Sequence, residues 1–207
     1  MIVSHRHRYI FFAVPKTATH AVREALRQNL GDDDWEQQVL TGQQFLPIPA
    51  LARIGHGHIS AQQAQAHLPE AMWRDYKKLA FVRNPYDRFV SACAFLNRNN
   101  PDYQASPLAW MKLALGREKF RQRILIQPQA GQLCDEQGDL AMDFVGRYES
   151  LQESMHEMCD LLALPRVELQ RRNTSNHRAY HETIDAELQQ ALTEFYADDL
   201  RLFDYRF

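Results

Sequence analysis

The first long apolar run of the chain, YIFFAV at residues 9–14, shows no alternation of apolar and polar positions. A short run rich in aromatic and β-branched residues is typical of a strand that is buried on both faces. Pro15 ends the run, because proline has no N–H group to donate to a sheet. From Ala21 onward the apolar residues recur at helical spacing. The pattern therefore predicts a strand, a tight turn at residues 16–20, and a helix.

Apolar runs and helical patterns continue to alternate along the chain. Further strands are expected at residues 54–59, 77–83 and 141–148. Two serine-based capping boxes, Ser60 with Gln63 and Ser150 with Glu153, predict helix starts, and Pro85 suits the first turn of a third helix. The other helices are expected at residues 108–115, 117–126 and 183–203. Connections are expected at residues 31–50, 97–107, 128–139 and 166–180.

Strands that alternate with helices predict an α/β fold, with a mainly parallel central sheet flanked by helices on both faces. The sequence shows no internal repeat or linker, so residues 1–207 are expected to form a single domain. Ligands of such sheets bind at the carboxyl ends of the strands. This rule places residues 15–20, 56–60 and 83–91 along one edge.

The composition of the chain mainly excludes classes of protein and of site. The chain has 24 basic and 26 acidic residues, and a net charge of −2 does not suit a general nucleic-acid binder. The three cysteines lie far apart without a CxxC motif, which favours a reducing compartment over a disulfide framework or a zinc site. The chain shows neither a membrane-spanning run nor a signal peptide, so no membrane association and a cytoplasmic location are expected.

The turn at residues 15–20 has the chemistry of an anion site. The first N–H groups of a helix lack internal partners and the helix dipole adds positive charge there. Lys16 supplies a point charge, and Thr17 and Thr19 supply hydroxyls. The alternative is a plain turn with a solvated lysine. A Walker A motif is missing, which disfavours ordinary ATP or GTP binding.

A second anion site is expected where the strand at residues 77–83 ends. Arg83 offers a guanidinium fork, and Ser91 offers a hydroxyl from the following helix. Together they suit a phosphate. The alternative is that Arg88 pairs with an acid such as Asp87 at the surface, and that Ser91 is an incidental helix residue.

His56 and His58 are candidates for a general base. In a strand they share one face, with glycines on the other, and histidine titrates near neutral pH. A metal site and purely structural histidines are the alternatives. A carboxylate base, Glu70 or Asp75, also remains open.

Two stretches of this chain resemble a known family. PKTATH after the first strand, together with AFVRNPYDRFVSACAF, resembles the sulfotransferases that use 3′-phosphoadenosine 5′-phosphosulfate (PAPS). The similarity is greatest to the branch that sulfates carbohydrates, including the heparan 2-O-sulfotransferase type, and it runs from about residue 9 to residue 178. Ala18 and His20 depart from that pattern, since the family usually has glycine and a hydroxyl residue there.

The resemblance implies a P-loop-like nucleotide-binding fold, PAPS as donor, adenosine 3′,5′-bisphosphate (PAP) as product, and no required metal. Lys16 would be catalytic, with His58 as base and His56 assisting. The 5′-phosphosulfate would be held by Pro15, Lys16, Thr17, Ala18, Thr19 and His20, and the 3′-phosphate by Arg83 and Ser91. Arg147 and Tyr148 at the end of the last strand, and Asn173 and Ser175 in a basic lid-like loop, are further candidate nucleotide contacts.

The expected function is therefore transfer of a sulfuryl group from PAPS to an acceptor hydroxyl, on a carbohydrate or a small metabolite. The alternatives are a P-loop-like kinase and a non-catalytic nucleotide-binding scaffold. The sequence leaves the identity of the acceptor and the oligomeric state open.

Overall fold

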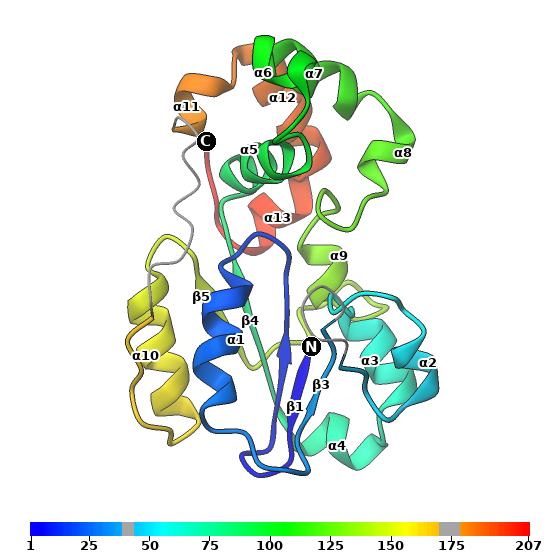
Figure 1. Cartoon of the computed structure of the whole chain (residues 1–207), viewed down its shortest axis with the longest axis vertical. Helices are drawn as coiled ribbons and strands as arrows, with labels where there is room; N and C mark the ends of the chain where they lie inside the picture. Colours follow the sequence, from blue (N-terminus) through cyan, green and yellow to red (C-terminus); the bar gives the residue numbers. More distant parts are fainter. Residues whose placement is uncertain (39–43, 170–178) are drawn as a thin grey trace. The chain divides into compact units, whose positions relative to one another are not determined.

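A computed structural model describes residues 1–38, 44–169 and 179–207 of the chain (Figure 1). The chain divides into two compact units. One comprises residues Met1–Val82 and Ala130–Arg172, and the other comprises Arg83–Gln129 and Asn173–Phe207. Each unit is described by itself below, and a single domain over residues 1–207 stays a prediction.

The first unit is built on a five-stranded sheet with the strand order β3-β1-β2-β4-β5. The strands are β1 (Ile2–Ser4), β2 (Tyr9–Phe12), β3 (Trp35–Glu36), β4 (Lys77–Val82) and β5 (Phe144–Arg147). β2, β4 and β5 pair in parallel, whereas β1 is antiparallel to both β2 and β3. The predicted parallel core is thus confirmed, and two unpredicted strands, β1 and β3, extend the sheet.

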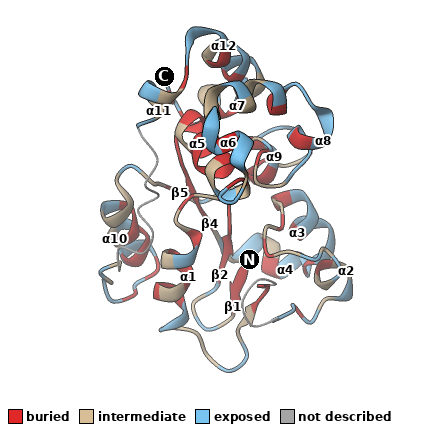
Figure 2. Cartoon of the chain, turned by 45° about the horizontal axis from the view of Figure 1, so that its top comes forward, coloured by how far each residue is buried: buried red, intermediate tan, exposed pale blue. Residues whose placement is uncertain are grey.

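Helices cover both faces of this sheet, as predicted for an α/β fold. On one face α1 (Thr19–Arg27) and α10 (Leu151–Leu161) pack against Tyr9 and Phe11. On the other face α4 (Glu70–Asp75) contacts the sheet through Trp73, whose ring meets Phe12 edge-on. The same side carries α2 (Pro49–Ala52), α3 (Ala61–His67) and α9 (Ala130–Leu133) (Figure 1). The strands between these layers are mostly buried, as the red colouring in Figure 2 shows.

The second unit is helical in its described part. Its helices are α5 (Pro85–Leu96), α6 (Pro101–Ala105), α7 (Pro107–Leu115), α8 (Glu118–Arg121), α11 (Tyr180–Thr183), α12 (Ala186–Phe195) and α13 (Ala197–Leu202). Their apolar faces form one core, which includes Phe89, Met111 and Leu192. Arg88 is fully buried and donates hydrogen bonds to the carbonyl oxygens of residues 125–127. The suggested surface pairing of Arg88 with Asp87 is therefore wrong.

Several local predictions are corrected. Residues 54–59 are not a strand but an irregular, bent segment, and β3 lies instead within the expected connection 31–50. The expected connections 97–107 and 128–139 contain the short helices α6 and α9, whereas only residues 118–121 of the expected helix 117–126 are helical. The single helix expected at residues 183–203 is divided into α12 and α13, and the unpredicted short helix α11 precedes them. These are short elements, whose local patterns are weak beside tertiary packing.

The predicted helix starts differ in outcome. Ser60 and Gln63 form a complete capping box at α3. Asn84 caps α5 by accepting a hydrogen bond from the N–H of Tyr86. Ser150 precedes α10 as expected, but its side chain makes no capping bond, so the helix was predicted correctly and its cap was not. Among the helices of the described residues, none is long and apolar enough to cross a membrane.

Candidate active site

The loop between β2 and α1 bends sharply at two residues. Lys16 and Ala18 both have left-handed backbone conformations, with φ of 67° and 60°. Ala18 is also the N-cap of α1, and it has no side-chain cap bond. The first N–H groups of α1 have no acceptor within the helix by its geometry. The loop therefore presents a helix N-terminus that no side chain of its cap residue covers.

The two threonine hydroxyls of the loop point back into the protein. Thr17 donates to Val14 O at 2.9 Å, and Thr19 donates to the same oxygen at 2.6 Å. Each hydroxyl has a single proton, so neither can donate to an anion while these bonds persist. Their role in this structure is to fold the loop onto the end of β2. The backbone N–H groups and Lys16 are then the loop's candidate anion ligands.

The two departures from the family pattern now have a physical reading. The left-handed conformation of Ala18 is one that glycine adopts without strain, which explains why glycine is usual at this position. His20 is exposed in the first turn of α1. Partial burial, followed by the charges of Arg23 and Lys16, lowers the pKa of His20. A neutral imidazole at this place offers one N–H donor in place of a hydroxyl.

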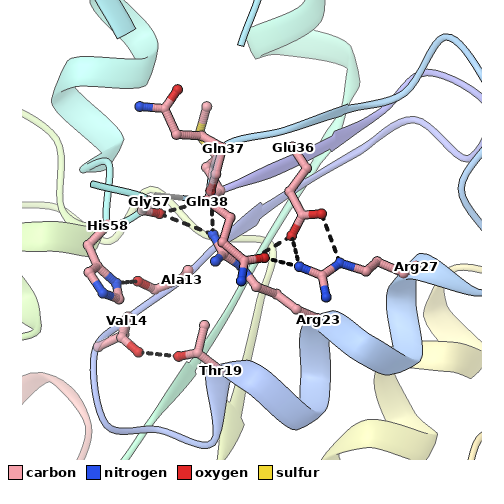
Figure 3. Close-up of polar contacts among 11 residues, drawn as sticks. Ala13, Val14, Thr19, Arg23, Arg27, Glu36, Gln37, Gln38, Gly57 and His58 are labelled. Atoms are coloured by element: carbon pink, nitrogen blue, oxygen red, sulfur yellow. Dashed lines mark hydrogen bonds and ion pairs between the residues drawn. The ribbon is translucent and has the colours of Figure 1, made fainter. Parts of the chain in front are cut away.

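His58 is anchored at the end of β2. Its Nδ1 lies 2.6 Å from Ala13 O, two residues before Pro15 (Figure 3). A carbonyl oxygen only accepts hydrogen bonds, so Nδ1 must carry the proton and Nε2 keeps a lone pair. Burial lowers the pKa of His58 to about 4, against the weaker opposing effect of the bond to Ala13. His58 is therefore a neutral imidazole at neutral pH, and its Nε2 lone pair can accept a proton, as a general base must.

His56 has the opposite tautomer. Its Nδ1 accepts the backbone N–H of His58 at 3.2 Å, which leaves the proton on Nε2 of the neutral ring. The two ring centroids lie 5.9 Å apart. The expectation that the two rings lie together holds, but through a bend with Gly55 at φ 70° and not through strand alternation. One ring can accept a proton while its neighbour donates a hydrogen bond.

The alternatives to a histidine base were the carboxylates Asp75 and Glu70, and the alternative role for the histidines was a metal site. Asp75 pairs with Arg74 and with Arg8. Asp75 precedes β4 and Arg8 precedes β2, so the pair lies at the opposite edge of the sheet from the Lys16 loop. The candidacy of Asp75 as a base is therefore wrong. Glu70 is exposed in the first turn of α4 and stays an alternative. Within the part of the chain that the structure describes, no cluster of three or more histidines, cysteines or carboxylates could hold a metal ion.

The carboxyl end of β5 lies at the same edge as the loop. Arg147 is the last residue of β5 and pairs in register with Val82 of β4. The Arg147 N–H donates to Ser154 Oγ, and the Tyr148 N–H donates to Val82 O at 2.8 Å. Because β2, β4 and β5 are parallel, the first unit brings the loop, His58 and the Arg147–Tyr148 pair to one edge.

Arg83 and Ser91 belong to the second unit. The Arg83 guanidinium contacts Asp87 through Nε at 2.8 Å and Nη2 at 2.7 Å, and only 5% of its side chain is exposed. Asp87 and Ser91 are four residues apart on α5, so they lie on one helix face. The ion pair therefore holds the guanidinium over the face that carries Ser91. Asn173 and Ser175 lie outside the described residues.

Two buried polar residues near the histidines were missed by sequence reasoning. Arg23 of α1, which lies beside Gly57 in Figure 3, donates to Gly57 O, and Gln37 after β3 donates to His56 O. In the sequence, only Gly57 between the two histidines indicated that another part of the chain approaches this segment closely. The sequence could not name its neighbours, since they come from distant parts of the chain.

Comparison with known proteins identifies the family. A model described as the sulfotransferase family matches residues 1–206. The chain belongs to this family. The sulfotransferase is also similar in fold to one from Alicyclobacillus acidocaldarius, whose crystal structure aligns with a TM-score of 0.50 and 18% sequence identity. That alignment covers 96% of this chain and 97% of the other. No curated protein sequence matches this sulfotransferase.

Proposed function

We propose that this sulfotransferase uses PAPS to sulfate an acceptor hydroxyl, with His58 as the general base. The observation that carries the proposal is the bond from His58 Nδ1 to Ala13 O, 2.6 Å long. Through this bond a neutral imidazole lies at the end of β2, the strand that leads into the Lys16 loop. A base and an anion-binding loop at one strand end are the two parts that in-line sulfuryl transfer needs.

The residues of the loop fit a phosphosulfate. The N-terminus of α1 favours negative charge, and Lys16 adds a full positive charge at the same turn. Both suit the charge that develops on the departing phosphate. A metal is not required by this chemistry, because lysine and backbone dipoles supply the positive charge. His20 would add an N–H donor to the 5′-phosphate.

The proposed step is balanced at named atoms. His58 Nε2 takes the proton of the acceptor hydroxyl while its oxygen forms a bond to sulfur. The bond between sulfur and the bridging oxygen breaks, and the electron pair leaves on the phosphate of PAP. Lys16 stabilises that phosphate, and His56 Nε2–H contacts the acceptor or its sulfuryl oxygens. The resemblance to the carbohydrate branch favours a sugar hydroxyl as acceptor, with a small metabolite as the other candidate.

Arg83 and Ser91 are proposed to bind the 3′-phosphate of the donor. Arg83 binds Asp87 through Nε and Nη2, and this pair holds the guanidinium at the start of α5. A planar guanidinium fork matches the oxygens of a phosphate. Arg147 and Tyr148 in the first unit, and Asn173 and Ser175, are proposed as further contacts of the nucleotide.

Nucleotide titration tests the proposal against its alternatives. We expect PAP to raise the melting temperature of the protein, and ADP to do so much more weakly. A preference for ATP with magnesium would favour the P-loop-like kinase. A lack of response to every nucleotide would favour a non-catalytic scaffold.

Substitutions then separate the roles. Arg83→Ala should weaken PAP binding by about 1.5–3 kcal/mol, the range of a hydrogen bond to a charged group, in isothermal titration calorimetry. Arg201→Ala removes an exposed arginine of the same unit and should leave PAP binding unchanged. His58→Ala should retain PAP binding and lose turnover with labelled PAPS. An unchanged rate would eliminate the base assignment.

A further inference from the structure

The His56–Gly57–His58 segment has no regular secondary structure, yet it must hold a base in place. One hydrogen bond lies within the segment, from His58 N–H to His56 Nδ1, and another joins the His58 ring to Ala13 O in a distant part of the chain. An irregular segment with only these bonds leaves its backbone carbonyls to be fixed by other elements. The structure supplies buried partners for two of them.

Gln37 holds the first carbonyl. Its side chain is fully buried, and its Nε2 donates to His56 O at 3.3 Å and to Leu51 O at 3.0 Å. Its Oε1 accepts the N–H of Leu46 at 3.2 Å. All three bonds are to backbone, so this one side chain fastens three points of the stretch from Leu46 to His56.

The second carbonyl, Gly57 O, accepts from the Met1 amine at 2.6 Å, and Arg23 adds a longer bond to the same oxygen. The Arg23 side chain is 6% exposed, its Nη2 donates to Gln37 O at 2.7 Å and to Gly57 O at 3.4 Å, and Glu36 lies 3.8 Å from Nε. Nε itself has no hydrogen-bond partner among the described residues. A buried charge with an unpaired donor is poorly optimised for stability, since apolar replacements of buried ion pairs are often neutral or stabilising. Its contacts with the segment suggest another reason for its presence.

Gly57 completes the arrangement. A Cβ atom on this residue would lie 2.5 Å from Gln37 O and 2.7 Å from Arg23 Nη2. The first of these is a backbone atom, which cannot move away as a flexible side chain could. The segment therefore packs so closely against Gln37, which follows β3, and Arg23 of α1 that only glycine fits at position 57.

We propose that Arg23 and Gln37 are positioning residues, which bind successive carbonyls of the His56–Gly57–His58 segment and thereby direct His58 Nε2 toward the acceptor. The catalytic part of this proposal rests on the proposed function, in which His58 is the base. Arg23 lies on the helix that follows the Lys16 loop, so one helix would align both the anion site and the base. Misplacing a base by about 1 Å costs on the order of 100-fold in rate.

The first test uses the wild-type protein and does not depend on activity. Imidazole ¹⁵N shifts of His58, measured by NMR at neutral pH, should show a single species protonated at Nδ1. A wild-type ring protonated at Nε2, or one that averages between tautomers, would overturn the proposal whatever the enzyme does.

The second test uses two variants that disturb the same contact from opposite sides. Gly57→Ala adds the clashing methyl, and Arg23→Met removes the donor while Arg27 still pairs with Glu36 at 2.7 Å. Each should lower kcat about 100-fold. The Kd of PAP should stay at the wild-type value, and the His58 shifts should show mixed tautomers. Gly131→Ala is the matched control, since its added Cβ meets nothing within 4 Å.

The outcomes separate this proposal from the proposed function. If PAP binds to wild type, and the folded variants keep both wild-type kcat and a single His58 tautomer, the positioning role is wrong and the sulfotransferase function stands. If wild type binds no PAP, the proposed function fails while the tautomer experiment still decides how His58 is held. Should either variant not fold, Arg23→Lys is measured in the same way, since it keeps the positive charge and one donor group. A wild-type kcat and an unchanged His58 tautomer in Arg23→Lys would also overturn the positioning role.

Discussion

The depressed pKa of His58 makes a prediction about stability that can be tested without any substrate. Burial holds the pKa of this imidazole at about 4 in the folded protein, whereas an ordinary histidine titrates near 6.5. The unfolded chain therefore binds a proton at a higher pH than the folded chain does. The contribution of His58 is fully present above about pH 6.5 and is lost as the pH falls toward about 4.

The size of the effect follows from the two pKa values. Between about pH 7.5 and about pH 5, linkage of one proton with these values lowers the free energy of unfolding by about 2 kcal/mol. His58→Gln removes the titration and keeps a polar side chain of similar length. Its free energy of unfolding should therefore fall by about 2 kcal/mol less than that of wild type over this interval.

Urea unfolding of both proteins at the two pH values measures the difference. The pKa values of His20 and His56 are also lowered, but these residues are present in both proteins and their effects largely cancel. The reasoning would be refuted if wild type and His58→Gln lost the same stability on acidification. In that case the pKa of His58 would lie near that of an ordinary histidine, and burial would not disfavour the charged ring.

Three further predictions concern packing. Arg88→Met should lower the free energy of unfolding by about 2–4 kcal/mol in urea, because three backbone carbonyls lose the charged donor that a fully buried side chain supplies, whereas the exposed control Arg201→Met should change it by less than about 0.5 kcal/mol. Gly146→Ala would place a Cβ 2.6 Å from an aromatic ring and should cost about 1–3 kcal/mol, with Gly131→Ala again near zero. Ala18→Gly should relieve the left-handed strain and raise the melting temperature; a lower value would contradict that account of the loop.

The elements that local chemistry specifies were read correctly from the sequence. The apolar runs of β2, β4 and β5, the complete capping box at α3 and Pro85 in the first turn of α5 depend on neighbouring residues alone. The tight turn between β2 and α1 is likewise a local strand–turn–helix pattern. A parallel sheet with helices on both faces follows from the order of these elements.

Only the tertiary structure decided how the His56–Gly57–His58 segment is held. The sequence suggested a strand there, because alternating glycine and histidine fits a period of two. Packing against Arg23, Gln37 and Ala13 bends the segment instead. These contacts join residues that are 19 to 45 positions apart.

The sequence also could not predict which arginine side chains are buried and what they pair with. Arg83 and Arg88 occur five residues apart in one motif, yet Arg83 pairs with Asp87 and Arg88 is enclosed in the helical core. Both are basic residues in a similar local pattern, and their difference comes from which backbone carbonyls and rings surround them. A residue's type and spacing determine which chemistry it can perform; its solvation and partners, which folding sets, determine its charge state, its tautomer and its direction.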